Sequence, residues 1–337
     1  MKKILVTGGC GYIGSHTLVE LIENGYEVIS VDNWSNSDES VLDGIRAIAG
    51  KKVKNYAVDL CNWKDTQQIF VENPDISGII HFAALKSVGD SVEQPLFYFE
   101  NNLMSLLHIL RCMVEFGVKN LIFSSSCSVY GNVSELPVVE TTKWQEAESP
   151  YARTKQMGEQ IIVDFSRRYP DFRSILLRYF NPAGAHESAL IGESPRNAAN
   201  NLVPIITETA IGKRNSFTVF GTDYPTRDGS CVRDYIHVMD LANAHLKALE
   251  FLRSEKSANN CEIFNAGIGE GVTVLEAIAA FEKTTGIRPN YQLGGRRDGD
   301  VMAIYSDYQK AATLLGWQPQ RNIEDIMRSA WAWEKKK

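Results

Sequence analysis

A tyrosine and a lysine four residues apart, Tyr151 and Lys155, stand in the segment Pro-Tyr-Ala-Arg-Thr-Lys (150–155). Residues at this spacing share one face of a helix, one turn apart. The lysine ammonium could therefore stabilise a phenolate and bring a tyrosine pKa of about 10 closer to working pH. Upstream, Ser126 ends an apolar run and could bind or relay a substrate proton. These three side chains are the parts of a general base for dehydrogenating an alcohol.

A cofactor that accepts the hydride would have a place near the N-terminus. The apolar residues 4–6 lead into a turn that contains Gly8, Gly11 and Gly14, and apolar residues then recur at helical spacing. Glycines allow positive φ and close backbone approach, and a helix N-terminus binds a pyrophosphate. The spacing G-x-x-G-x-x-G differs from the strict dinucleotide motif, so the turn alone is a weak signal.

An acidic residue after the next apolar run strengthens that interpretation. Residues 28–31 end in Asp32, eighteen residues after Gly14. An acid at this point accepts hydrogen bonds from the adenosine ribose hydroxyls and repels a 2′-phosphate. The sequence therefore predicts NAD as the cofactor rather than NADP.

Apolar strands alternate with helical stretches through the first half of the chain, which predicts an α/β fold with a doubly wound parallel sheet. Each run stops in small or polar residues, and in such sheets ligands bind beyond the carboxyl ends of the strands. We therefore expect one edge of the sheet to bring together a set of strand-end residues. These are Gly8, Asp32, Asp59, Ala83, Ser126 and Asn181.

The composition of the sequence changes near residue 182, where glycine, proline and asparagine become frequent. This pattern predicts a nucleotide-binding domain over residues 1–181 and a smaller, mixed substrate-binding lobe over residues 182–337. Segments near 231–266 are expected to return to the first domain, because Phe264-Asn265-Ala266-Gly267 has the form of another strand of the main sheet.

Composition limits the function classes. The chain has 337 residues, 44% of them hydrophobic, and a formal net charge of -6, so nucleic-acid binding gains no support. Six cysteines without a C-x-x-C pair indicate free thiols in a reducing compartment. The six histidines have no metal-site spacing, so no metal is expected. No apolar run approaches the ~18 residues that span a membrane, and a cytoplasmic protein is predicted.

Ordered blocks along nearly the whole chain resemble the extended short-chain dehydrogenase/reductase family, and within it the enzymes that epimerise UDP-hexoses at C4. The blocks that carry the resemblance are residues 6–16, 31–37, 81–89, 124–131, 150–155, 177–186, 223–226, 233–240 and 296–300. The resemblance implies a Rossmann-type sheet and an isomerase that interconverts UDP-galactose and UDP-glucose through a transient 4-keto sugar, with reversible hydride transfer to tightly bound NAD. It also implies a homodimer.

Carried over by position, the resemblance assigns two sets of binding residues besides the catalytic Ser126, Tyr151 and Lys155. The NAD set is Gly8, Gly11, Tyr12, Ile13, Gly14, Asp32, Asn33, Asn36, Ser37, Asp59, Leu60, Phe82, Ala83, Ala84, Lys86, Asn101, Ser124, Tyr151, Lys155, Tyr179 and Phe180. The UDP-sugar set is Lys86, Ser126, Tyr151, Asn181, Asn200, Asn201, Leu202, Thr218, Val219, Phe220, Arg233, Tyr235, Arg297, Asp300 and Ile304. The choice of Arg297 over its neighbour Arg296 depends on the resemblance alone.

Two other functions compete with epimerisation. A nucleotide-sugar 4,6-dehydratase would share the fold, NAD and the Tyr/Lys pair, but similar dehydratases carry an Asp-Glu pair where this chain has Cys127 and Ser128. A non-catalytic NAD-binding scaffold would not need Ser126, Tyr151 and Lys155. Both alternatives are therefore less favoured than epimerisation.

Ile304 bears on substrate breadth. In similar epimerases a tyrosine at this position accompanies restriction to glucose and galactose, whereas a small residue accompanies turnover of N-acetylated hexosamines. Isoleucine is smaller than tyrosine but lacks a hydrogen-bonding group for the acetamide, and its β-branch is stiff. Good UDP-glucose/galactose activity and weak UDP-N-acetylglucosamine activity are expected.

Overall fold

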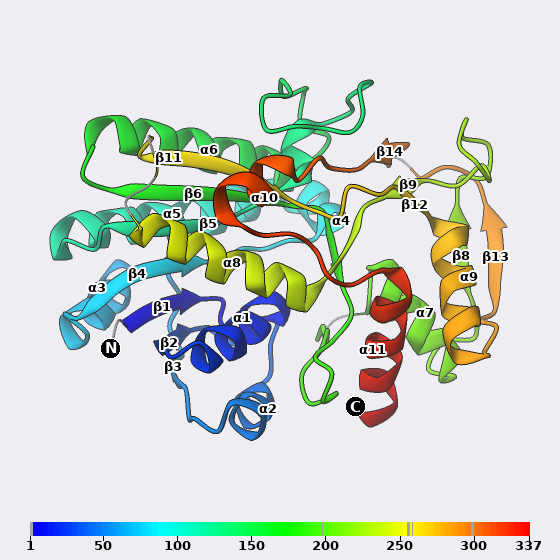
Figure 1. Cartoon of the computed structure of the whole chain (residues 1–337), viewed down its shortest axis with the longest axis horizontal. Helices are drawn as coiled ribbons and strands as arrows, with labels where there is room; N and C mark the ends of the chain where they lie inside the picture. The colour runs from blue at the N-terminus through cyan, green and yellow to red at the C-terminus, as the bar shows by residue number, and fades with distance from the viewer. Residues whose placement is uncertain (1–2, 197, 255–256, 258, 298–299) are drawn as a thin grey trace.

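The computed structural model describes residues 3–196, 198–254, 257, 259–297 and 300–337. A large α/β part built around a parallel sheet lies beside a smaller lobe that contains the C-terminal helix (Figure 1). The chain passes between these two parts more than once, as the colours of the ribbon show.

Within the described residues, seven parallel strands form the main sheet in the order β11-β6-β5-β4-β1-β2-β3. Their bounds are β1 (Lys3–Thr7), β2 (Glu27–Val31), β3 (Lys54–Tyr56), β4 (Ile76–His81), β5 (Asn120–Ser126), β6 (Arg173–Tyr179) and β11 (Cys261–Ala266). The predicted α/β class with a doubly wound sheet is thus confirmed. The strand order reverses at β1, between β4 and β2, where such sheets bind ligands.

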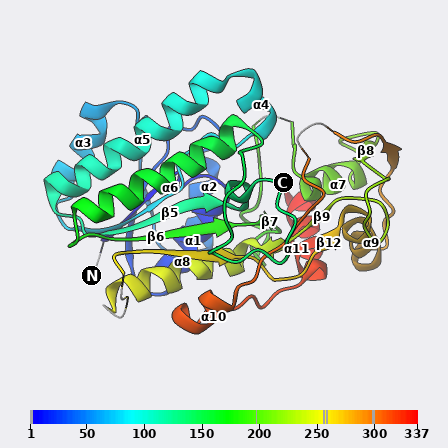
Figure 2. The ribbon, with the colours of Figure 1, turned by 90° about the horizontal axis from the view of Figure 1, so that it is seen from above.

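Helices cover both faces of this sheet (Figure 2). One face carries α3 (Trp63–Glu72), α5 (Pro95–Phe116) and α6 (Pro150–Arg168), and α4 (Val88–Glu93) lies at their end. The other carries α1 (Tyr12–Glu23), α2 (Ser40–Ala49) and α8 (Val238–Arg253).

Alternate strand residues point to opposite faces, and both faces are buried. Ile4 and Val6 of β1 pack with α1 and α8, while Leu5 between them packs with α5. This arrangement explains why the strands read as uninterrupted apolar runs. None of the helices in the described ranges is both long and apolar enough to cross a membrane.

The lobe consists of helices and short strands that follow β6. Its elements are β7 (Asn181–Ala183), α7 (Leu202–Ala210), β8 (Phe217–Phe220), β9 (Val232–Arg233), β10 (Tyr235–His237), β12 (Val272–Thr273), α9 (Val274–Thr285), β13 (Tyr291–Gly294), β14 (Ala303–Ile304) and α11 (Ile323–Lys336). The strands pair as β10-β7, β12-β9-β14 and β13-β8. Val203, Ile206, Phe281 and Met327 belong to the core between α7, α9 and α11. Between β14 and α11, α10 (Gln309–Leu315) packs on β11 and α8 of the large part.

Candidate active site

A cavity of about 660 Å³ lies at the carboxyl ends of the central strands. Every residue that the sequence assigned to NAD lies on its wall. The wall includes Gly8, Gly11, Tyr12, Ile13, Gly14, Asp32, Asn33, Asn36, Ser37, Asp59, Leu60, Phe82, Ala83, Ala84, Lys86, Asn101, Ser124, Tyr151, Lys155, Tyr179 and Phe180. Ser126 lies on the same wall.

The glycine turn packs so closely against neighbouring backbone that it has no room for side chains at Gly8 and Gly14. Gly8 has φ +65°, and a Cβ there would lie 2.9 Å from the Ala83 nitrogen. A Cβ on Gly14 would lie 2.2 Å from the Gly8 carbonyl oxygen. Helix α1 starts at Tyr12, and no side chain caps its first N–H groups. The turn therefore fits a pyrophosphate, which the free N–H groups and the positive end of the helix would bind.

Asp32 is held in place by three donors from two sides. One carboxylate oxygen accepts from the Cys10 amide at 3.1 Å, and the other accepts from the Trp34 amide at 3.0 Å and the Ser37 hydroxyl at 2.8 Å. These bonds direct the carboxylate at the end of β2 beside the glycine turn. Its position and charge suit ribose hydroxyls and oppose a phosphate.

The candidate catalytic groups come from the end of β5 and the first turns of α6. Ser149 caps α6 by accepting from the Ala152 amide at 3.2 Å, and Pro150 occupies the first turn. Lys155 is 4% exposed, and its Nζ lies 5.9 Å from the centre of the Tyr151 ring. That Nζ donates a 2.6 Å hydrogen bond to the Ser124 carbonyl oxygen.

Ser126 ends β5 and caps the short 3-10 helix η1 (Cys127–Tyr130). Its hydroxyl oxygen accepts from the Ser128 amide at 3.2 Å and from the Ser128 hydroxyl at 3.0 Å. The Ser126 proton therefore remains free to be donated toward the cavity.

The pKa of Tyr151 differs from the sequence-based expectation. Burial raises this pKa to about 12, and the facing Ser126 hydroxyl acts in the opposite direction. Burial also lowers the pKa of Lys155 to about 8, against the raising effect of Glu159. The expected lowering of the tyrosine pKa is wrong for the protein alone, because the burial of the phenol outweighs the lowering effect of the Ser126 hydrogen bond.

Two further polar groups lie at the end of β6 and at the start of β7. The Tyr179 hydroxyl donates to His245, whose other ring nitrogen donates to the Leu241 carbonyl oxygen. The side-chain oxygen of Asn181 is buried without a hydrogen-bond partner in the described structure, although Asn181 lines the cavity. An unpaired buried oxygen at a cavity wall suits a ligand that donates a hydrogen bond.

The predicted UDP-sugar residues divide into two groups. Lys86, Ser126, Tyr151, Asn181 and Asn201 line the cavity. The others lie off its wall, on or beside elements of the lobe: Asn200, Leu202, Thr218, Val219, Phe220, Arg233, Tyr235, Arg297, Asp300 and Ile304. All of the predicted NAD residues therefore line the cavity, but only some of the predicted UDP-sugar residues do.

Within the lobe, two arginines meet one carboxylate. Arg297 donates to Asp300 at 2.8 and 3.2 Å, and the Arg233 guanidinium lies 3.7 Å from the same carboxylate. The Arg297 guanidinium also lies 5.4 Å from the centre of the Phe220 ring. Arg233 opposes the burial effect that raises the pKa of Cys127 to about 12, so Arg233 lies near the residue that follows Ser126.

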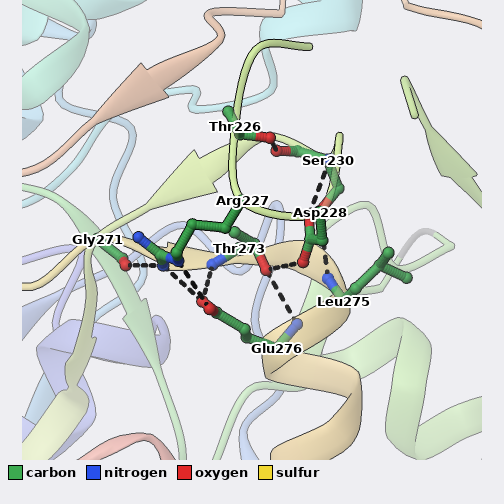
Figure 3. A network of polar contacts seen from close by, with 8 residues as sticks. All are labelled: Thr226, Arg227, Asp228, Ser230, Gly271, Thr273, Leu275 and Glu276. Atoms are coloured by element: carbon green, nitrogen blue, oxygen red, sulfur yellow. Dashed lines mark hydrogen bonds and ion pairs between the residues drawn. The ribbon is translucent and has the colours of Figure 1, made fainter. Parts of the chain in front are cut away.

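A polar network supports the strand that carries Arg233 (Figure 3). Arg227 donates to the Glu276 carboxylate at 2.8 and 2.6 Å and to the Gly271 carbonyl oxygen at 2.6 Å. Thr273 caps α9 and donates to Asp228. Because β12 pairs with β9 at Val272 and Arg233, these contacts anchor the arginine strand to a helix end.

Glu193 is a wall residue that sequence reasoning missed. It accepts from Lys86 at 3.3 Å and from Asn201 at 2.6 Å, and its carbonyl oxygen accepts from the Trp333 indole at 3.0 Å. Its loop-rich surroundings give no spacing that would mark it out. The contact between Lys86 and the loop depends on tertiary structure.

The sheet, the glycine turn and the Ser126, Tyr151 and Lys155 arrangement define a dinucleotide-binding enzyme of the short-chain dehydrogenase/reductase type. A family model described as "GDP-mannose 4,6 dehydratase" matches residues 5–330. The chain is 47% identical to a UDP-glucose 4-epimerase of Haemophilus influenzae over 98% of this chain and 97% of the relative.

Two solved structures extend the comparison. A UDP-glucose 4-epimerase from Bifidobacterium longum in complex with NAD+ and UDP has a TM-score of 0.95 and 43% identity, covering 99% of this chain and 98% of that one. One from Stenotrophomonas maltophila with bound NAD and formylated UDP-arabinopyranose has a TM-score of 0.96 and 44% identity, covering 100% and 98%. The chain belongs to the UDP-glucose 4-epimerase family within the broader family that the matching model describes.

Proposed function

We propose that this protein is an NAD-dependent isomerase that interconverts UDP-galactose and UDP-glucose by inverting C4 of the hexose. The observation that carries the proposal is the shared wall: Ser126, Tyr151 and Lys155 lie on the same cavity as Asp32 and the glycine turn. A general base and a dinucleotide site are therefore within one space, and the two similar solved structures contain UDP and formylated UDP-arabinopyranose beside their dinucleotide.

Tyr151 serves as the base in its phenolate form, which the positive charges of Lys155 and of the nicotinamide of bound NAD would favour over the buried phenol, and takes the proton from the sugar 4-hydroxyl. Ser126 holds the 4-oxygen and relays its proton, since the Ser126 oxygen is oriented by Ser128. Lys155 supplies positive charge beside the phenol. When bound, NAD accepts hydride from C4 and returns it to the other face of the 4-keto sugar, so the net redox change is zero.

NAD is proposed to span the cavity from Asp32 to Tyr151, with its pyrophosphate at the N-terminus of α1. The site residues fit the cofactor, because no side chain caps the first N–H groups of α1 and Asp32 is already oriented. Mass analysis of cofactor released from the purified protein should find NAD. A majority of NADP would contradict the role of Asp32.

The UDP part is proposed to bind between the cavity mouth and the lobe. Arg233 and Arg297 provide the positive charge for the pyrophosphate, and both already contact a carboxylate, Asp300. The other residues proposed for this site are Asn200, Asn201, Leu202, Thr218, Val219, Phe220 and Tyr235. We also propose that residues 1–181, with the returning segments near 231–266, form the NAD-binding domain and that the rest forms mainly the substrate lobe.

The dehydratase alternative lacks its acid and base at the expected place. Cys127 and Ser128 begin η1 directly after Ser126, and the Ser128 side chain is engaged with Ser126. Burial raises the pKa of the Cys127 thiol to about 12, which makes it a poor proton-transfer group near neutral pH. Epimerisation is favoured for this reason.

The decisive assay uses no added cofactor. Purified protein is incubated with UDP-galactose, and UDP-glucose is measured by chromatography, with Tyr151→Phe as the inactive control. Appearance of UDP-glucose in the wild type alone is expected. A 4-keto-6-deoxy product would indicate a dehydratase instead. No turnover at all would favour the non-catalytic NAD-binding scaffold.

Two copies are proposed to form a homodimer through α5 and α6. Large apolar side chains are exposed along these two packed helices: Leu96, Phe97, Met104, Leu107, Val114 and Met157. Leu107→Glu should convert the dimer to monomers in sedimentation analysis. Val71→Glu, at an exposed apolar residue on α3, is the matched control.

Six free thiols support a further proposal that the protein works in the reducing cytoplasm.

A further inference from the structure

A buried ion pair lies behind the catalytic groups. Glu159 and Arg178 are each 1% exposed. The guanidinium donates from Nε at 2.9 Å and from Nη2 at 2.7 Å to the two oxygens of the Glu159 carboxylate. One of these oxygens also accepts from the Ser125 hydroxyl. Such a pair is expensive to desolvate, and stability alone is weak grounds for keeping it.

The Glu159 carboxylate joins α6 and β5, the two elements that carry the catalytic groups. Glu159 stands on α6 one turn after Lys155 and two turns after Tyr151. Ser125 stands on β5 between Ser124, which accepts from Lys155, and Ser126. Helix α6 packs over these strands (Figure 2). The contacts of Glu159 therefore set the position of α6 relative to the strand end.

Arg178 extends the connection along β6. It directly precedes Tyr179, which lines the cavity. Its Nη1 donates at 3.2 Å to the carbonyl oxygen of Glu140, and its guanidinium lies 4.8 Å from the centre of the Tyr130 ring. The arginine is thus fixed on several sides and cannot turn away from Glu159 without leaving unpaired polar groups buried.

We propose that Glu159 is a positioning residue of the active site: its carboxylate, fixed by Ser125 and Arg178, keeps Lys155 charged and holds α6 against β5 and β6. This inference deepens the proposed function and rests on it, because it gives Glu159 a role only through Lys155 and Tyr151.

Among the titratable groups described around Lys155, Glu159 supplies the negative charge that balances the ammonium. His81 on β4 is neutral near pH 7, because burial and Lys155 lower its pKa to about 3. Burial raises the pKa of the other neighbouring acids in this region and keeps them protonated; these are Tyr98 on α5, Tyr151 on α6, Tyr179 on β6, Cys127 in η1 and Cys261 on β11. Glu159 opposes the burial of Lys155, which lowers the lysine pKa to about 8.

The charge of Lys155 depends on pH. Lys155 carries its charge below about pH 8 and loses it above. Replacing Glu159 by glutamine removes the negative charge, leaves the Arg178 charge uncompensated, and lowers the lysine pKa further. The ammonium then disappears at a lower pH, and the alkaline limb of kcat should move down by about one pH unit.

The test compares four proteins. Glu159→Gln keeps the shape of the side chain and removes its charge, and Glu159→Gln/Arg178→Met removes both charges. Asp240→Asn is the matched control, since Asp240, on α8 across the sheet from α6, is a buried carboxylate that pairs with Arg321. Each is compared with wild type by kcat and KM across pH and by ¹⁵N-lysine NMR titration, with Lys155→Met assigning the signal.

Glu159→Gln should lower the Lys155 pKa measured by NMR, shift the alkaline limb of kcat downward, and leave KM for UDP-galactose within about twofold. In the double variant the Lys155 pKa and the alkaline limb of kcat should return part of the way to the wild-type values. Asp240→Asn should leave the alkaline limb unchanged. An unchanged Lys155 titration in Glu159→Gln would overturn the inference. A wild type without epimerase activity would instead overturn the proposed function, and the NMR arm distinguishes these failures.

Discussion

At the dinucleotide end of the cavity, the wall residues stand at the ends of strands in a seven-stranded sheet, as the described residues show. In the lobe, several of the proposed sugar-nucleotide residues stand on strands of two to four residues, such as β8, β9 and β14, and others lie in loops. The first region has its geometry set by a large core. The second depends on local contacts such as the Arg227 and Glu276 pair.

This difference supports our proposal that the protein holds its cofactor rigidly and allows the keto sugar to turn. A strand end buried on both sides has few ways to relax. Short strands joined by loops can adjust at lower cost. An epimerase requires both, because its cofactor must stay fixed while the 4-keto sugar presents its other face.

The largest expected effect lies where the two regions meet. Tyr151→Phe removes the proposed base and should lower kcat by ~10²–10⁴-fold, with KM for UDP-galactose little changed. Tyr98→Phe, at another buried tyrosine nearby, should keep kcat within about threefold. Equal losses in both variants would remove Tyr151 from its special role.

A pair of glycine substitutions compares rigidity directly. A Cβ on Gly14 would lie 2.2 Å from the Gly8 carbonyl oxygen, whereas a Cβ on Gly295 in the lobe meets nothing within 4 Å. Gly14→Ala should cost ~1–3 kcal/mol of unfolding free energy and reduce the bound NAD. Gly295→Ala should leave both near wild type, as measured by denaturant unfolding and cofactor content. Similar losses in both would mean that the two regions are equally rigid.

The two neighbouring arginines sharpen the assignment in the lobe. Arg297 contacts Asp300 near Phe220, whereas Arg296 contacts Asp223. Arg297→Met should raise KM for UDP-galactose ~10–100-fold, because a charge-assisted hydrogen bond is worth about 1.5–3 kcal/mol. Arg296→Met should change KM less than threefold. The reverse ranking in steady-state kinetics would exchange the two roles.

The smallest effect concerns Ile304, whose family match places it against the hexose. Here it is buried with Val129, Tyr130, Val138 and Phe180. Ile304→Tyr should abolish the weak UDP-N-acetylglucosamine activity, and Ile304→Ser should raise it severalfold, with UDP-galactose turnover nearly constant. Identical kcat/KM ratios for the two substrates in all three proteins would mean that Ile304 only packs the core.

The strand ends were predictable because their chemistry is local. The apolar run before Asp32 and the glycines before Tyr12 define their own positions, and parallel strands bring such ends to one edge. The helical spacing of Tyr151 and Lys155 was equally readable from the sequence. The element bounds extended beyond the apolar runs, since β6 includes Arg178, whose charge is matched by Glu159.

What the sequence could not provide came from contacts between distant segments. Glu193 reaches Lys86 across 107 positions, and no local pattern indicates this pairing. The pKa of Tyr151 was misjudged for a related reason, because the burial that raises it to about 12 is set by the whole fold. Asp300 joins Arg233 to Arg297 only after the lobe has formed.

One hydrogen bond connects the dinucleotide end of the cavity to the lobe. The Tyr12 hydroxyl, at the first residue of α1, donates at 2.6 Å to the carbonyl oxygen of Gly184 in the loop that enters the lobe. A Cβ on Gly184 would lie 2.9 Å from Ser329 on α11, so this loop has little freedom to retreat. A dinucleotide bound at the N-terminus of α1 and a sugar nucleotide bound by the lobe should therefore both affect the contact between Tyr12 and Gly184. Each ligand should change the affinity of the other by the same factor, as thermodynamic linkage requires.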